Sequence, residues 1–177
     1  MDAGLLLLRV LLAVILFAHA GQKTLGWFQG QGIGKMAGVF ENLGLKPGRV
    51  MVLAAAVAEV CGAISLLLGF LTPAGALITA ATMAVAGLTM QRAAGSFWNA
   101  AGGGEYPFVL AVMAVAIGFT GPGALSIDRA IQHLLPAGEA LLGANLIVGV
   151  TIPVLAVVAL IPFALRLRRS SGARAEG

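Results

Sequence analysis

The sequence predicts an all-α integral membrane protein: a four-helix transmembrane bundle followed by an additional C-terminal transmembrane helix. Its 177 residues are 59% hydrophobic and only 10% charged, whereas soluble domains carry about 25% charged residues. The mean hydropathy is +0.99, and the apolar residues form long uninterrupted runs. The 25 glycines favour close approach between helices in lipid.

Apolar runs of roughly 20 residues match the thickness of a bilayer when they form helices. Five runs are candidates, of which the third and fourth are short: 5–25, 50–71, 74–90, 106–119 and 146–165. Helices are expected because backbone polar groups must be satisfied internally in lipid. Thr72-Pro73 predicts a tight hairpin between the second and third runs, and glycines flank the fourth. Pro153 and Pro162 predict a kink in the last run.

The distribution of lysine and arginine predicts the orientation. With five spans, one side holds most of the basic residues: Lys23, Lys35, Lys46, Arg49, Arg92, Arg166, Arg168, Arg169 and Arg174. The other side holds Arg129, and Arg9 if it snorkels outward. We therefore expect a multi-pass protein of the bacterial cell (inner) membrane with a cytoplasmic C-terminus. If the last run lay on the membrane surface instead, only four spans would remain and this count would weaken.

The first run is expected to be retained as a span. A cleaved signal peptide would begin with basic residues, but here Asp2 comes first and Arg9 interrupts the apolar stretch. The predicted organisation is a four-helix membrane domain over 1–130, a connecting segment and fifth helix over 131–165, and a basic, disordered cytoplasmic tail over 166–177.

Charged residues inside apolar runs are the first candidates for function. Glu59 lies near the middle of the second run and Arg9 lies inside the first. An unpaired charge at the bilayer centre costs at least ~2.5–3.5 kcal/mol. Because the two spans are antiparallel, we expect the depths of these residues to differ by less than ~10 Å, so Arg9 is the predicted partner of Glu59. Such a pair would either fix helix register or handle a proton or polar head group; both interpretations stay open.

The end of the first run carries a second group of polar and aromatic residues. His19 and Lys23 are four residues apart and share a helical face. They form either an ordinary interfacial helix end or part of a polar site. Trp27 and Phe28, with Trp98 further along, are typical of the aromatic belt at a membrane interface.

The segment before the fourth run supplies further polar candidates. Glu105 begins that run, where the helix dipole stabilises an anion. It is either a helix cap or a contact for Lys23 on the same side of the membrane, with Asn99 and Tyr106 as nearby donors.

Several chemistries are disfavoured. The single cysteine, Cys61, allows no intrachain disulfide, and no Cys/His cluster predicts a metal site. His19 and His133 are predicted on opposite sides, which argues against a bis-histidine haem. No nucleotide-binding fingerprint occurs, and the thinly spread charge does not indicate nucleic acid. We assign no catalytic residue and expect no tightly bound cofactor; electron transfer would need a borrowed one, such as a membrane quinone.

Several motifs in order resemble the DoxX family of small bacterial membrane proteins. They are Leu-Leu-Leu-Leu-Arg9, His19-Ala-Gly-Gln-Lys23-Thr-Leu-Gly-Trp27-Phe28, Phe40-Glu-Asn-Leu-Gly-Leu, Ala58-Glu59 with Gly62 and Gly69-Phe-Leu-Thr72, and Asn99 followed by Gly-Gly-Glu105-Tyr106-Pro107. The resemblance extends over 5–129 and implies a four-helix membrane bundle, with the final run beyond the family pattern. It implies that the family's polar positions correspond to Arg9, His19, Lys23, Glu59, Asn99, Glu105 and Tyr106. Family members are associated with thiosulfate:quinone oxidoreductase subunits and with mycobacterial membrane assemblies that respond to oxidative stress.

Three functional hypotheses follow. The first is a non-catalytic membrane subunit that anchors or organises a redox complex, with Trp27, Phe28 and the loop 30–49 facing a soluble redox protein on the cytoplasmic face. The alternative is a quinone-interacting oxidoreductase subunit that uses His19, Lys23, Glu59 and Tyr106. A weaker alternative is a small transporter or proton-relay protein with Arg9 and Glu59 as its gate. The chain is not expected to be an enzyme by itself, and a homo-oligomer is a further option.

Overall fold

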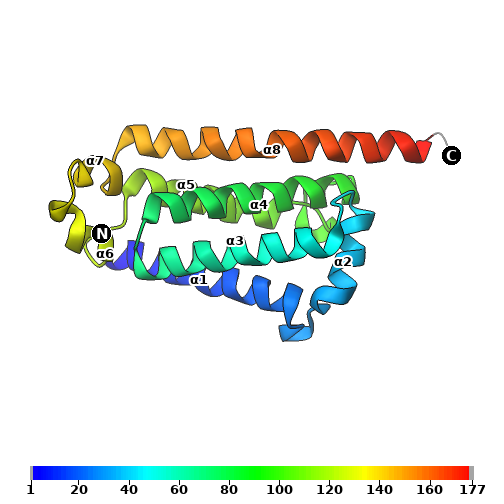
Figure 1. Cartoon of the computed structure of the whole chain (residues 1–177), viewed down its shortest axis with the longest axis horizontal. Coiled ribbons are helices and arrows are strands. Elements are labelled where there is room, and N and C mark those ends of the chain that lie inside the picture. The colour runs from blue at the N-terminus through cyan, green and yellow to red at the C-terminus, as the bar shows by residue number, and fades with distance from the viewer. Residues whose placement is uncertain (1, 176–177) are drawn as a thin grey trace.

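The computed structural model describes the backbone of residues 2–175 and the side chains of residues 2–165, and within this part every regular element is a helix (Figure 1). In chain order they are α1 Asp2–Thr24, η1 Trp27–Gln29, α2 Gly32–Asn42, α3 Gly48–Leu68, α4 Thr72–Ala94, η2 Asn99–Ala101, α5 Glu105–Thr120, α6 Ile127–Ile131, η3 Gln132–Leu134, α7 Gly138–Leu142 and α8 Leu146–Ala175. The predicted all-α class is confirmed.

Four of these helices are long and apolar enough to cross a membrane: Asp2–Thr24, Gly48–Leu68, Thr72–Ala94 and the stretch Leu146–Leu165 of α8. Helix α5 is apolar but has only 16 residues. The outward surfaces of the long helices carry exposed aliphatic side chains such as Leu7, Val57 and Ile147. A surface of this kind is suited to lipid rather than water, so the chain is an integral membrane protein.

Helices α1, α3, α4 and α5 pack side by side as a bundle, and α8 lies along α4 and α5 (Figure 1). The centre of the bundle is filled by fully buried aliphatic side chains, among them Leu12, Leu16 and Leu66. Between α4, α5 and α8 the buried residues are mostly alanines. Small residues let the helix backbones approach closely, which replaces the hydrophobic driving force that lipid does not supply.

The hairpin between α3 and α4 is confirmed, but α3 ends earlier than its apolar run predicted. Gly69 adopts a left-handed conformation with φ of 60°, the Gly69 N–H donates to Leu66 O at 3.3 Å, and the Phe70 N–H donates to Ser65 O at 3.0 Å. These are the bonds of a helix-ending motif in which the left-handed residue is usually glycine. Because Phe70 and Leu71 are apolar, hydropathy alone hid this end, and the turn lies at 69–71.

Several segments differ from the sequence-based prediction. The first loop, predicted over 30–49, contains the helix α2. The connecting segment contains η3 and α7, and the short helix α6 precedes it at the end of the region predicted as the four-helix domain. The tail 166–177 was expected to be disordered, but α8 continues as a helix to Ala175; residues 176–177, and the side chains of the tail arginines, lie outside the described part. Pro153 and Pro162 are both inside α8.

Arg9 holds together the end of the bundle where the chain begins. Its side chain is 1% exposed. Its Nε donates to Leu66 O at 2.8 Å and its Nη2 to Leu67 O at 3.3 Å. Its Nη1 donates to Pro122 O at 2.5 Å and to Leu125 O at 3.0 Å. The guanidinium therefore binds the last carbonyls of α3, which have no partner inside the helix, and attaches the loop that follows α5.

Asp128 complements this arrangement at the start of α4. Its carboxylate is fully buried and accepts from the backbone N–H groups of Leu71 at 2.8 Å and Thr72 at 2.7 Å. Its own N–H donates to Gly69 O at 2.8 Å. A carboxylate at a helix N-terminus satisfies free donors and interacts favourably with the helix dipole. Arg9 and Asp128 carry opposite charges and stabilise the same α3–α4 turn. Arg9 binds carbonyl groups at the end of α3, and Asp128 binds N–H groups at the start of α4.

The Arg9 contacts predict a large structural effect of mutation. Arg9→Gln should lower the free energy of unfolding by about 3 kcal/mol, because several buried carbonyls lose a charged donor. Detergent-titration unfolding measures this change. Arg129→Gln, at an exposed position of the same end, is the control and should change stability by less than about 0.5 kcal/mol. Equal stability of the two variants would contradict the structural role of Arg9.

Candidate functional site

Lys23 and Glu59 form an ion pair inside the bundle. The Lys23 Nζ donates to Glu59 Oε1, and the side chains are 16% and 0% exposed. Lys23 is in the last turn of α1, while Glu59 is in the middle of α3. Side chains on a helix point toward its N-terminus, so the lysine extends from the interfacial end of α1 back into the bundle. Lys23 thus supplies a positive charge to Glu59, which is fully buried in an apolar helix.

The predicted partnership between Arg9 and Glu59 is wrong. Arg9 is level with Leu66, whose carbonyl it binds. Glu59 lies seven residues earlier on the same helix, a separation of about 10 Å along its axis. The predicted depths of Arg9 and Glu59 differed by less than ~10 Å, but hydropathy does not fix the register of α1 against α3. The transporter hypothesis, which used this pair as a gate, loses its structural basis.

The second oxygen of the Glu59 carboxylate is buried and has no hydrogen-bond partner among the described residues. Thr79 Oγ1 of α4 is likewise buried and without a partner among these residues. It lies against Gly62, one helical turn after Glu59 in α3, because a Cβ added to Gly62 would be 2.5 Å from it. Leaving such groups unsatisfied costs roughly 1–3 kcal/mol each. Proteins tolerate such departures from local rules mainly at functional sites. Glu59 therefore combines one fixed charge contact with one oxygen that remains able to accept a hydrogen bond.

His19 and Tyr106 extend the polar region towards the membrane interface. Their rings stack with centroids 5.9 Å apart and planes at 25°, and His19 lies on the same face of α1 as Lys23, four residues before it. Tyr106 is 39% exposed. The structure thus brings four of the predicted site residues into one connected group, from Glu59 through Lys23 and His19 to Tyr106.

Asn99 and Glu105 close the neighbouring loop. The Asn99 N–H donates to Glu105 Oε2 at 3.0 Å, and the Glu105 N–H donates to Phe97 O at 2.9 Å. Glu105 was predicted to cap the helix that it begins or to contact Lys23, but its carboxylate closes the preceding loop instead, and α5 has no side-chain cap bond. Lys23 takes Glu59 as its carboxylate partner instead.

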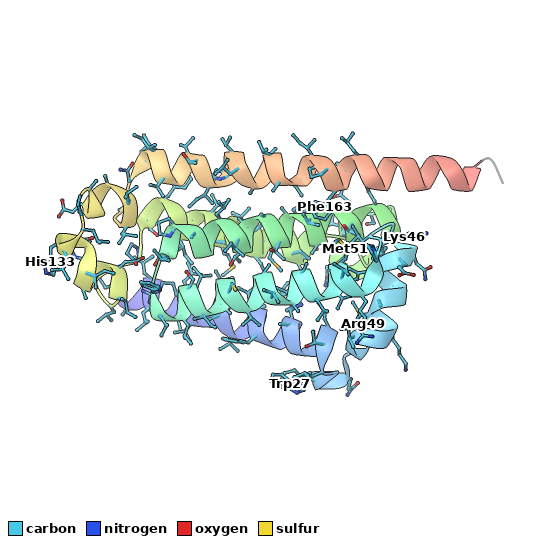
Figure 2. The ribbon with its side chains drawn as sticks, in the orientation of Figure 1. Trp27, Lys46, Arg49, Met51, His133 and Phe163 are labelled. Atoms are coloured by element: carbon cyan, nitrogen blue, oxygen red, sulfur yellow. The ribbon has the colours of Figure 1, made fainter. Side chains whose placement is uncertain are left out.

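A cavity of 560 Å³ adjoins the ion pair. Its walls come from α2, α3, α4 and α8, and its polar contributors are Lys23, Gln31 and two threonines of α4. Figure 2 labels two of its apolar wall residues, Met51 of α3 and Phe163 of α8, near the end of the bundle that α2 crosses. An apolar cavity with a few convergent polar groups is the usual form of a small-molecule site.

Helix α2 covers this cavity and is the main part of the site that the sequence analysis missed. Met36, Val39, Phe40 and Leu43 line the cavity, a spacing typical of one helical face. This periodicity was available in the sequence, but the glycines of the segment favoured a loop. Two of these glycines bracket the helix in left-handed conformations, Gly32 with φ of 67° and Gly44 with φ of 84°.

The predicted interface aromatics are exposed. Trp27, Phe28 and Trp98 are 51%, 73% and 64% exposed, and Figure 2 shows Trp27 beside the end of α1. Within residues 2–165, no group of three or more His, Cys, Asp or Glu side chains is placed to hold a metal ion.

The ion pair predicts non-additive mutational effects. Lys23→Met and Glu59→Gln should each destabilise the protein by about 3 kcal/mol, since each leaves a buried group without its partner. The double variant should lose clearly less than the sum of the two. Lys35→Met, on the exposed side of α2, serves as the matched control. Detergent unfolding of all four proteins gives the coupling energy, and additive losses would show that the pair is not formed.

No curated protein and no solved structure gives a significant match to this chain. The family model DoxX matches residues 4–92, a range that contains α1 to α4 almost completely and both members of the Lys23–Glu59 pair. The match covers half of the chain and agrees with the resemblance of its motifs. The chain belongs to the DoxX family.

Proposed function

We propose that this DoxX-family protein is a quinone-interacting membrane subunit of a redox complex. The observation that carries the proposal is the 560 Å³ cavity, almost entirely apolar, with the Lys23 ammonium at its wall. A quinone needs an apolar slot for its ring and tail and a hydrogen-bond donor for a carbonyl oxygen. Lys23 supplies that donor.

Glu59 allows the Lys23 side chain to stay charged inside the bundle. Glu59 lies behind Lys23 and supplies the opposite charge that makes an ammonium tolerable at this depth. The stacked rings of His19 and Tyr106 connect the same group to the interface, where protons are available.

The lining of the cavity favours a flexible, lipophilic ligand over a polar one. Met36, Met51 and Met90 contribute unbranched, adaptable side chains. Its volume falls in the range of about 300–1,000 Å³ typical of ligand pockets. A polar solute would leave most of its hydrogen-bonding groups unpaired against these walls.

The proposed membrane arrangement has five spans, with α5 as the short fourth one. The C-terminus of α1, α2 and the C-terminus of α4 lie at one end of the bundle (Figure 1). Lys23, Lys35, Arg49 and Arg92 belong to this end, which supports a cytoplasmic assignment for it. Arg9 and Arg129 belong to the opposite end.

Quinone binding is tested by calorimetric titration of the purified protein in nanodiscs with a short-chain benzoquinone. Ala55→Phe, which places a ring in the cavity, should weaken binding at least tenfold. The pair-removing variant Lys23→Met/Glu59→Gln should weaken it about tenfold, because a charge-assisted hydrogen bond of roughly 1.5–3 kcal/mol is lost. Ala116→Phe, at an exposed position of α5 outside the cavity, should bind like the parent. Absence of saturable binding to the parent, or full binding to Ala55→Phe, would refute the proposal.

The anchoring role is a second candidate, favoured by the exposure of Phe28 and Trp98. Phe28 has a positive φ of 49°, an uncommon conformation for a bulky residue. The anchor hypothesis predicts that Phe28→Ser/Trp98→Ser lowers recovery of a soluble redox protein that co-purifies with the chain. Phe70→Ser, at the exposed α3–α4 turn on the opposite end, should leave recovery unchanged. If the parent, the double variant and Phe70→Ser all recover the same amount of partner, Phe28 and Trp98 contact only lipid and the anchoring role is refuted.

A further inference from the structure

A second apolar groove lies on the outer surface of the bundle, between α1 and α3. It has a volume of 320 Å³ and is separate from the cavity beside the ion pair. Its walls include Phe17 of α1 and Leu53, Val57 and Cys61 of α3, and the ring of Trp27 lies at one end. The two sites share none of their wall residues.

The position of Trp27 is set by the packing of its own segment. A Cβ added to Gly21 would lie 2.3 Å from Cε3 of Trp27, too close for contact, so the indole rests directly on the backbone of α1. The ring is still 51% exposed. Tryptophan prefers the boundary between hydrocarbon and head groups, which places this end of the groove at the membrane interface and the Cys61 end in the hydrocarbon.

The surroundings of the groove identify the material that fills it. Both flanking helices are long and apolar enough to cross a membrane, so the groove opens towards acyl chains. The groove is almost wholly apolar, and its side chains with a polar atom are those of Thr24, Trp27 and Cys61. A lipid acyl chain fits this environment.

Arg49 lies at the interfacial end of α3, on the face of that helix that lines the groove. Arg49 is exposed and precedes Leu53 by four residues, so it lies on the groove side of α3, about 6 Å beyond Leu53 along the axis. The carboxylate of Glu41 has a backbone partner of its own, since its Oε1 accepts from the Gly48 N–H at 3.0 Å. The neighbouring exposed charge, Lys46, is also basic.

We infer that this groove binds an anionic phospholipid, with one acyl chain between α1 and α3 and Arg49 on the phosphate. Charge complementarity selects the anionic head group, and shape and polarity select the chain. This lipid site is independent of the proposed quinone site, because Arg49 and the groove walls take no part in the latter. Its occupant would hold α1 against α3, the two helices that carry Lys23 and Glu59.

Tryptophan quenching by brominated lipids tests the inference. The chain has two tryptophans, so Trp98→Phe leaves Trp27 as the only reporter. The protein is reconstituted in phosphatidylcholine vesicles containing a fixed fraction of either brominated phosphatidylglycerol or brominated phosphatidylcholine. Bromine quenches only indoles that it contacts, so the two quenching curves compare occupancy of the groove by each head group.

We expect phosphatidylglycerol to be preferred about fivefold over phosphatidylcholine, the effect of one basic residue near the lipid surface. Arg49→Gln should abolish the preference, and high salt should reduce it. Lys35→Gln, at an exposed position of α2, should retain it. Cys61→Phe, which fills the deep end of the groove, should reduce quenching by both lipids.

Equal quenching by the two lipids in the parent protein would overturn the inference. Retention of the full preference in Arg49→Gln would overturn it as well, by showing that the selectivity is a property of the whole basic end. Neither outcome depends on quinone binding, so failure here leaves the calorimetric test of the proposed function unaffected.

Discussion

A charged group inside hydrocarbon has to be matched by opposite charge or by hydrogen-bonding groups, and this requirement shapes both ends of the bundle. At one end the Arg9 guanidinium binds the carbonyls that end α3 and the loop after α5. Deeper along α1 and α3, Lys23 neutralises Glu59. In the first arrangement each guanidinium nitrogen has a backbone acceptor, and the arrangement is structural. The second leaves Glu59 Oε2 unpartnered among the described residues and adjoins a cavity, so it is the one suited to function.

The architecture was largely predictable because hydropathy reports directly on burial in lipid. Apolar runs gave the long helices, and Thr72-Pro73 gave the hairpin between α3 and α4. Element ends depended on single residues: Gly69 ends α3 through its left-handed conformation, while the apolar pattern continues past it. Helix α2 was missed because its glycines resemble a loop, although its apolar residues have helical spacing. The part played by Asp128 depends on a chain reversal that brings α6 back to the α3–α4 turn, and no local pattern encodes that.

The polar residues of the site were identified, but their partners were not. Glu59, Lys23, His19 and Tyr106 stand out because lipid-facing helices rarely carry such groups. Choosing between Arg9 and Lys23 as the partner of Glu59 required the register of α1 against α3, which depends on side-chain packing at Leu16 and Gly62 rather than on hydropathy. The cavity could not be predicted at all, since it is bounded by helices distant in sequence, from α2 to α8. Function in this account therefore rests on tertiary placement of a few charged groups.

The most direct test of the central claim is a dipolar distance measurement by solid-state NMR in lipid bilayers, between the ¹⁵N-labelled lysine side chains and the ¹³C-labelled glutamate carboxylates. The account predicts strong dephasing that assigns to Lys23 Nζ and disappears in Glu59→Gln. Persistence of the signal in that variant, or its absence from the parent protein, would show that Glu59 is neutralised in another way and that the buried pair beside the cavity does not exist.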